Sequence, residues 1–241
     1  MPPALEVWET IGSTNDRALK LGREGVPHGS AVAARRQTAG RGRRGHVWES
    51  PEGNVYLSVV LRPRVVPSRL PGLAAACGLG AADALEALLA SNAPQLKWPN
   101  DLLVAGRKLG GILVEVARDG NDEAFAVCGI GINIESAPRD MGAISLTELG
   151  ATASFSALAG ALRAGILSRV DAWASATGER PLDGVREAYL ERLAWRGEEV
   201  VASSPTGREL ARGTLDTIDP WGRAIVDGTP YSAEQASLRP A

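Results

Sequence analysis

Five arginines gather in the stretch from residue 35 to residue 48, where glycines are interleaved and acidic residues are absent. Glycine lets backbone N–H groups turn toward an anion, and guanidinium groups donate charge-assisted hydrogen bonds to carboxylate or phosphate oxygens. The pattern is typical of an anion-binding loop. A solvated basic loop without a ligand and a nucleic-acid patch are the alternatives. The lack of interleaved aromatic residues disfavours nucleic acid.

A second group of reactive side chains follows in KWPNDLLVAGRKLGGILVE, residues 97–115. Only three of the 26 basic residues are lysines, and Lys97 and Lys108 are two of them. A lysine kept in an arginine-rich chain indicates a place that a planar guanidinium cannot fill. The two ammonium groups are candidates for neutralising a triphosphate, and Asp101 with Asn100 for holding Mg²⁺ through oxygen ligands.

Glycines in this segment and in GIGIN, residues 129–133, indicate close approach by another group. Gly110 and Gly111 weaken an apolar strand unless something must come near it. The spacing in GIGIN is not the dinucleotide fingerprint and is weak evidence for a nucleotide. For residues 97–115 the structural alternative is turn chemistry after Pro99 and a hairpin near Gly106.

Composition narrows the functional classes. The chain has 241 residues, a formal charge of -2, two cysteines and two histidines. A zinc site, a disulfide scaffold and triad hydrolysis are disfavoured, and so is a global field that would attract nucleic acid or an anionic membrane. No apolar stretch has the length of a membrane span. We expect a cytoplasmic protein.

The candidate residues must be positioned by alternating strands and helices. The sequence predicts strands at 5–8, 30–35 and 55–61, then adjacent strands in 96–134 with a tight turn at Ala105 and Gly106. Helices are expected after a cap among Ser13 to Asn15, at 73–91, from Phe155 to Trp173 after Ser154, and at 183–194.

Beyond Arg196 the pattern changes to short alternating segments with turn signals, as in a small barrel or sandwich. We therefore predict an α/β (α+β) fold: a mixed-sheet catalytic domain over residues 1–194 and a C-terminal β-barrel of five or six strands over residues 195–241.

Four of these segments, taken in order, resemble the biotin protein ligase family. They are STN at residues 13–15, QTAGRGRRG at 37–45 with Trp48 after it, KWPNDL through GRKLGGILVE, and GIGIN. The C-terminal segment resembles the small SH3-like barrel of that family. The resemblance implies that biotin and MgATP give biotinyl-5′-adenylate and pyrophosphate, after which a lysine of a biotin carboxyl carrier domain of an acyl-CoA carboxylase attacks the mixed anhydride.

The resemblance also implies roles for particular residues, with Lys108 and Arg43 as the catalytic pair. Lys108 would bridge the biotin carboxylate and the α-phosphate, and Asp101 would hold Mg²⁺. Biotin would contact Ser13, Thr14, Asn15, Gln37, Arg41, Gly42, Arg43, Trp48 and Lys108. ATP would contact Arg41, Arg44, Lys97, Asn100 and Asn133.

Two departures from regulatory family members shape the expectation. The catalytic pattern begins within the first fifteen residues, which leaves no place for a winged-helix DNA-binding domain, so a monofunctional ligase is expected. A tryptophan near the adenylate is replaced within GAISL, residues 142–146. The alternatives are a lipoate or octanoate ligase and a non-catalytic biotin sensor. A monomer and a homodimer both stay open.

Overall fold

The computed structural model describes residues 3–89, 92–138 and 142–241. Two β-sheets organise the chain. The strands of the first are β1 (Leu5–Ile11), β2 (Ala31–Gln37), β3 (Val55–Leu61), β4 (Gln95–Lys97), β5 (Asp101–Val104), β6 (Arg107–Arg118) and β7 (Ala124–Ile132). Those of the second are β8 (Glu199–Ser203), β9 (Glu209–Ile218), β10 (Ala224–Val226), β11 (Thr229–Tyr231) and β12 (Ser237–Pro240).

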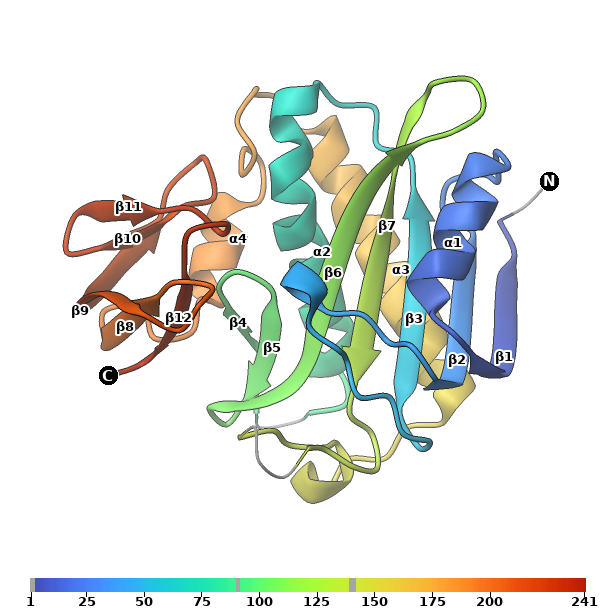
Figure 1. Ribbon diagram of the computed structural model, residues 1–241, viewed down its shortest axis with the longest axis horizontal. Coiled ribbons are helices and arrows are strands. Elements are labelled where there is room, and N and C mark those ends of the chain that lie inside the picture. Colours follow the sequence, from blue (N-terminus) through green and yellow to red (C-terminus); the bar gives the residue numbers. More distant parts are fainter. Residues whose placement is uncertain (1–2, 90–91, 139–141) are drawn as a thin grey trace.

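The first sheet has the order β1-β2-β3-β7-β6-β5-β4 (Figure 1). Its strands β1 and β2 are parallel, and every other neighbouring pair is antiparallel. The second sheet is antiparallel, with the order β11-β10-β9-β8-β12. The helices are α1 (Thr14–Arg23), α2 (Leu73–Glu86), α3 (Phe155–Ser175) and α4 (Arg186–Glu191), with 3-10 turns η1 (Arg43–Gly45), η2 (Pro67–Gly72) and η4 (Thr147–Leu149).

Each face of the mixed sheet has its own hydrophobic core. Helices α2 and α3 pack together behind the sheet in Figure 1 and bury Leu57 of β3 with Ile130 of β7. Helix α1 covers part of the opposite face, where Ala18 packs near Val60 and Phe125. Successive residues of a strand point to opposite faces, so the fully buried β3 supplies both cores. The rest of the α1 face lies beneath the loop between β2 and β3 (Figure 1).

The mixed α/β fold and the small C-terminal β domain predicted from the sequence are confirmed. The tight turn at Ala105 and Gly106 joins β5 to β6, and both residues have positive φ, 49° and 72°, as a two-residue hairpin turn requires. Among the described residues, none of the helices has the length and apolar character needed to cross a membrane.

Two helices are shorter than predicted. The helix expected over 73–91 ends at Glu86, and residues 90 and 91 lie outside the described ranges. The helix expected over 183–194 spans only Arg186–Glu191, because the chain after it turns toward the sheet: Leu96 N donates to Arg192 O at 2.7 Å, and Ala194 N donates to Leu96 O at 3.0 Å. A domain boundary at residue 195 stays a prediction; the second sheet begins at Glu199.

Candidate functional site

A cavity of about 570 Å³ opens on the α1 side of the mixed sheet, beneath the loop that joins β2 to β3. Every residue that the sequence assigned to a site lines this cavity. They are Ser13, Thr14, Asn15, Gln37, Arg41, Gly42, Arg43, Arg44, Trp48, Lys97, Asn100, Asp101, Lys108 and Asn133. Motifs that are far apart in the chain therefore meet in one place.

One end of the cavity carries neutral hydrogen-bonding groups at the start of α1. Ser13 caps the helix by accepting from Asp16 N, and Thr14 donates from both N and Oγ1 to Gln37 Oε1, at 2.8 and 3.0 Å. The buried Ser58 Oγ lies 2.8 Å from Thr14 Oγ1 and 2.6 Å from Asn15 Oδ1. Its single proton serves one of them at a time. This end suits a ligand with its own donors and acceptors.

The arginine loop is folded as a short hairpin rather than an extended segment. Gly42 N donates to His46 O at 2.7 Å, and Trp48 N donates to Gly40 O at 3.0 Å. Ser50 ties the hairpin to β2, since its Oγ donates to Trp48 O and accepts from Gln37 Nε2. Nearby, Tyr56 donates to Pro51 O at 2.8 Å, and burial raises the pKa of Tyr56 to about 12, so the phenol stays neutral.

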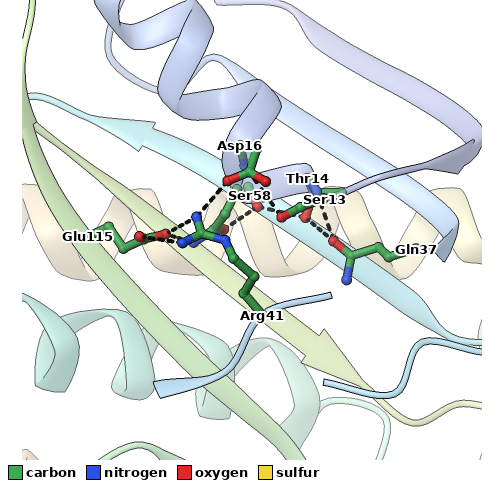
Figure 2. A network of polar contacts seen from close by, with 8 residues as sticks. Ser13, Thr14, Asp16, Gln37, Arg41, Ser58 and Glu115 are labelled. Carbon is green, nitrogen blue, oxygen red and sulfur yellow. Dashed lines mark hydrogen bonds and ion pairs between the residues drawn. The ribbon is translucent and has the colours of Figure 1, made fainter. Parts of the chain in front are cut away.

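Arg41 anchors this hairpin to two carboxylates, as Figure 2 shows. Its guanidinium donates to both oxygens of Glu115, at 2.9 and 2.7 Å, and lies 2.8 Å from Asp16 Oδ1. Glu115 also accepts from Asn15 Nδ2 at 2.8 Å. The loop, β6 and the start of α1 are thereby linked by one polar network.

Glycines on β6 and β7 form the floor beneath this network. A Cβ at Gly111 would come within 2.9 Å of the Trp48 ring, one at Gly131 within 2.7 Å of Trp48 Nε1, and one at Gly129 would overlap Asn15 Oδ1. The close approach predicted for Gly111 is therefore made by Trp48. The indole Nε1 is buried and has no hydrogen-bond partner among the described residues.

The other end of the cavity is dominated by Asp101 between two lysines. Lys108 Nζ lies 2.7 Å from Asp101 Oδ1, and Lys97 Nζ lies 3.0 Å from Asp101 Oδ2. Burial opposes ionisation of Asp101, but the charges of Lys108 and Lys97 outweigh it and hold the pKa of this carboxyl below its usual value. Lys108 Nζ also lies 5.0 Å from the centre of the Trp48 ring, a cation–π contact.

The predicted Mg²⁺ ligand does not fit this geometry. Both oxygens of Asp101 face ammonium groups, whereas a resident Mg²⁺ needs free carboxylate oxygens. Asn100 donates to Ile112 O and accepts from Arg43, so its side chain is also engaged. Across residues 3–89, 92–138 and 142–241, no cluster of three or more His, Cys, Asp or Glu side chains could hold a metal ion.

Arg43 and Arg44 connect the loop to the C-terminal β domain. Arg43 donates to Asn100 Oδ1 at 3.2 Å and to Ala233 O at 2.9 Å, and Arg44 donates to Ala233 O and Ala236 O. Burial and the neighbouring charge of Arg44 lower the pKa of Arg43. Arg43 therefore links the turn between β4 and β5 to the segment between β11 and β12, and Arg44 donates to carbonyl oxygens of that same segment.

Asn133 and the segment after residue 141 hold the backbone of Lys108. Lys108 N donates to Gly142 O at 3.1 Å, and Lys108 O accepts from Ile144 N at 2.9 Å. Asn133 Nδ2 donates to Ile144 O at 3.1 Å. Ala143 lines the cavity, so a small side chain stands in the segment where regulatory family members were expected to carry a tryptophan.

Sequence reasoning did not single out Asp16, Ser50 or Ser58, and it placed Glu115 in the group at residues 97–115 without giving it a partner. Ser58 carried a usable signal, because a serine inside the apolar run VYLSVVL must find a partner once it is buried. Glu115 ends the GILVE run, but its partners Asn15 and Arg41 come from other motifs and could not be paired by spacing.

Comparisons with known proteins agree with this geometry. The Biotin/lipoate A/B protein ligase family model matches residues 7–133. A biotin–[acetyl-CoA-carboxylase] ligase of Paracoccus denitrificans is 37% identical over 229 residues, 90% of this chain and 91% of that protein. A Bacillus subtilis bifunctional ligase/repressor BirA is 37% identical over 133 residues, 55% of this chain; the match spans only 41% of that protein.

The structural comparison extends over nearly the whole chain. The Aquifex aeolicus biotin protein ligase in complex with biotin and ATP superposes with a TM-score of 0.82 at 27% identity, and 99% of each chain is covered. The structural superposition and the sequence matches lead to the same assignment. The chain belongs to the biotin/lipoate A/B protein ligase family and, within it, to the biotin protein ligases.

Proposed function

We propose that the chain uses ATP to convert biotin to biotinyl-5′-AMP and then transfers biotin to a lysine of the biotin carboxyl carrier domain of an acyl-CoA carboxylase. The observation that carries the proposal is one cavity, lined in part by Trp48, that has a neutral hydrogen-bonding end and a cationic end. The names of the relatives support it, since they include a biotin–[acetyl-CoA-carboxylase] ligase and a biotin protein ligase with biotin and ATP bound. We propose that the reaction takes place in the cytoplasm.

The neutral end suits the ureido ring of biotin. A ureido group has two N–H donors and one carbonyl acceptor, and Ser13, Thr14, Asn15 and Gln37 offer hydroxyl and amide groups of both kinds. The apolar rings of biotin and its acyl chain would lie alongside Trp48, whose ring is seated on the glycine floor. The carboxylate would then point toward Lys108.

In the first step, a biotin carboxylate oxygen attacks the α-phosphorus of ATP and pyrophosphate leaves. Lys108 stabilises the negative charge that gathers between the two substrates, and Arg43 neutralises the phosphate side. Asp101 and Trp48 already hold the Lys108 ammonium in the cavity. Little reorganisation is therefore needed when a substrate anion replaces the Asp101 carboxylate as the partner of Lys108.

In the second step, the uncharged ε-amine of the carrier lysine attacks the acyl carbon of the adenylate. The new C–N bond replaces the C–O bond to phosphate, AMP leaves, and the amine loses a proton to solvent. No enzyme nucleophile takes part, which agrees with the scarcity of histidine, since the chain has only two that could activate such a group. Alignment of the reactants supplies most of the rate.

The proposal is tested by incubating the chain with biotin, MgATP and a purified carrier domain. We expect pyrophosphate release and one modified lysine by mass spectrometry. Excess lipoate should not compete, which separates biotin from the lipoate and octanoate alternatives. Biotin binding without pyrophosphate release would indicate the non-catalytic sensor and would overturn the proposal.

A further inference from the structure

Glu115 lies where the arginine loop meets the neutral end of the cavity. Its carboxylate accepts from both terminal guanidinium nitrogens of Arg41, at 2.9 and 2.7 Å (Figure 2). It also accepts from the amide nitrogen of Asn15 at 2.8 Å. The side chain is 26% exposed, so it is partly shielded from solvent. A bidentate guanidinium–carboxylate pair fixes the orientation of both partners.

The backbone of β6 explains why a carboxylate can reach both partners. β5 pairs with β6 only along Arg107–Gly111, and Glu115 pairs with Val127 of β7. Gly111, Leu113, Glu115 and Ala117 alternate along β6, and alternate residues share one face of the sheet. Gly111 lies against Trp48, and Ala117 packs with the core beneath α1, so Glu115 is placed between the loop and the helix.

Asn15 depends on Glu115 for one side of its carboxamide. Ser58 occupies Oδ1, and the floor at Gly129 leaves no room for a side chain beneath it. Only Nδ2 can donate to a carboxylate, so Glu115 determines which way the amide faces. In a Glu115→Gln variant, the Asn15 amide would no longer face the negative charge that distinguishes its nitrogen from its oxygen.

We propose that Glu115 is a positioning residue that couples closure of the arginine loop to the orientation of Asn15 at the head-group end of the cavity. The inference rests on the proposed function, because it assumes that biotin occupies this cavity. Arg41 and Asn15 bind the same carboxylate, so a closed loop stabilises the oriented amide. By linkage, biotin bound to the oriented amide stabilises the closed loop to the same degree.

The first test compares Glu115→Gln with Asp16→Asn. Each change removes one negative charge that faces Arg41. Among the described residues, Arg41 is the only partner that Asp16 and Glu115 have in common, and the Asp16 side chain is 61% exposed. Glu115→Gln should raise the Kd for biotin about tenfold, because one charge-assisted contact to each partner is weakened. It should also speed the release of biotinyl-5′-AMP. Asp16→Asn should change either value less than about threefold.

The second test asks whether the two partners of Glu115 are coupled, first with Glu115 intact and then in the Glu115→Gln background. Arg41→Gln and Asn15→Ala are made singly and together, and biotin Kd is measured by calorimetry. We expect the combined loss to be about fivefold smaller than the product of the separate losses, because either change alone already breaks the shared arrangement. In the Glu115→Gln background the losses should multiply. A role limited to stabilising the fold would not produce this difference.

The inference is overturned if Glu115→Gln binds biotin with wild-type Kd, or if Arg41→Gln and Asn15→Ala act independently in the wild-type background. Either result would leave the proposed function standing, provided the wild-type chain still modifies the carrier. If Glu115→Gln fails to fold, the cycle on Arg41 and Asn15 decides alone. A wild-type chain that binds no biotin overturns both proposals together.

Discussion

A single methyl group added at Gly131 tests how the Trp48 indole is seated. The Cβ of an alanine there would lie 2.7 Å from Trp48 Nε1 and 2.8 Å from Cε2, whereas ordinary contact begins at 3.4 Å. The indole must therefore move by about 0.7 Å. Gly131 lies in β7, paired with Tyr56 of β3 and Gly111 of β6, and does not have positive φ, so the backbone itself accepts alanine.

The Gly131→Ala substitution should disfavour the closed loop rather than lower the free energy of unfolding. Overpacking a well-packed site costs about 1–3 kcal/mol, and the loop can relieve it by opening. A cost near 1.4 kcal/mol corresponds to about a tenfold lower kcat/KM for biotin, with a small change in Tm. Displacing Trp48 also disturbs its contact with Lys108.

Steady-state kinetics with biotin as the varied substrate measures this effect, and thermal unfolding provides the second reading. Gly12→Ala is the matched control, since its Cβ would meet nothing within 4 Å. We expect wild-type kinetics for the control. If Gly131→Ala also keeps the wild-type kcat/KM for biotin, the position of Trp48 does not affect biotin binding and the account of the cavity is wrong.

Three further predictions concern other parts of the site. Burial works against the Asp101 carboxylate, but Lys108 and Lys97 lower its pKa below 3.8, so its contribution to stability is present above about pH 3.8 and is lost as the pH falls through the lower pKa of the folded state. The difference in unfolding free energy between wild type and Asp101→Asn should therefore narrow as the pH falls in that range, and a difference that stays constant in acid titrations would contradict this prediction. Ser58→Ala should lower the free energy of unfolding by about 1–3 kcal/mol and raise the KM for biotin, because Asn15 loses a buried partner; calorimetry and kinetics check both, and unchanged values would refute the role of Ser58. Arg43→Gly removes the contact with Ala233 O and should let biotinyl-5′-AMP escape to lysines of an added unrelated protein, detected by blotting; label confined to the carrier would count against the loop assignment.

The sequence predicted the parts of this structure that depend on local pattern. The run VYLSVVL is apolar throughout and matches β3 residue for residue, and Ser13 caps α1 as its type suggests. The site residues could be grouped because their motifs fall at strand ends and turns, which the sheet order then brings together.

The sequence did not predict contacts that depend on the tertiary fold. Arg43 and Arg44 bind backbone carbonyls near Ala233, and a carbonyl has no side-chain signature. Asp101 has the residue type of a metal ligand, but only the fold shows that two ammonium groups already face it. The helix expected to reach Ala194 stops at Glu191 because Leu96 takes over the hydrogen bonds of its last residues.

Biotin-dependent exchange of labelled pyrophosphate into ATP tests the central claim most directly, because it reports formation of the adenylate without the carrier. The account predicts that wild-type exchange requires biotin and that Lys108→Met lowers the exchange rate by about 100-fold or more, while biotin Kd changes only a few-fold. Exchange that proceeds without biotin, or that persists at the wild-type rate in Lys108→Met, would contradict the claim that this cavity activates biotin through Lys108.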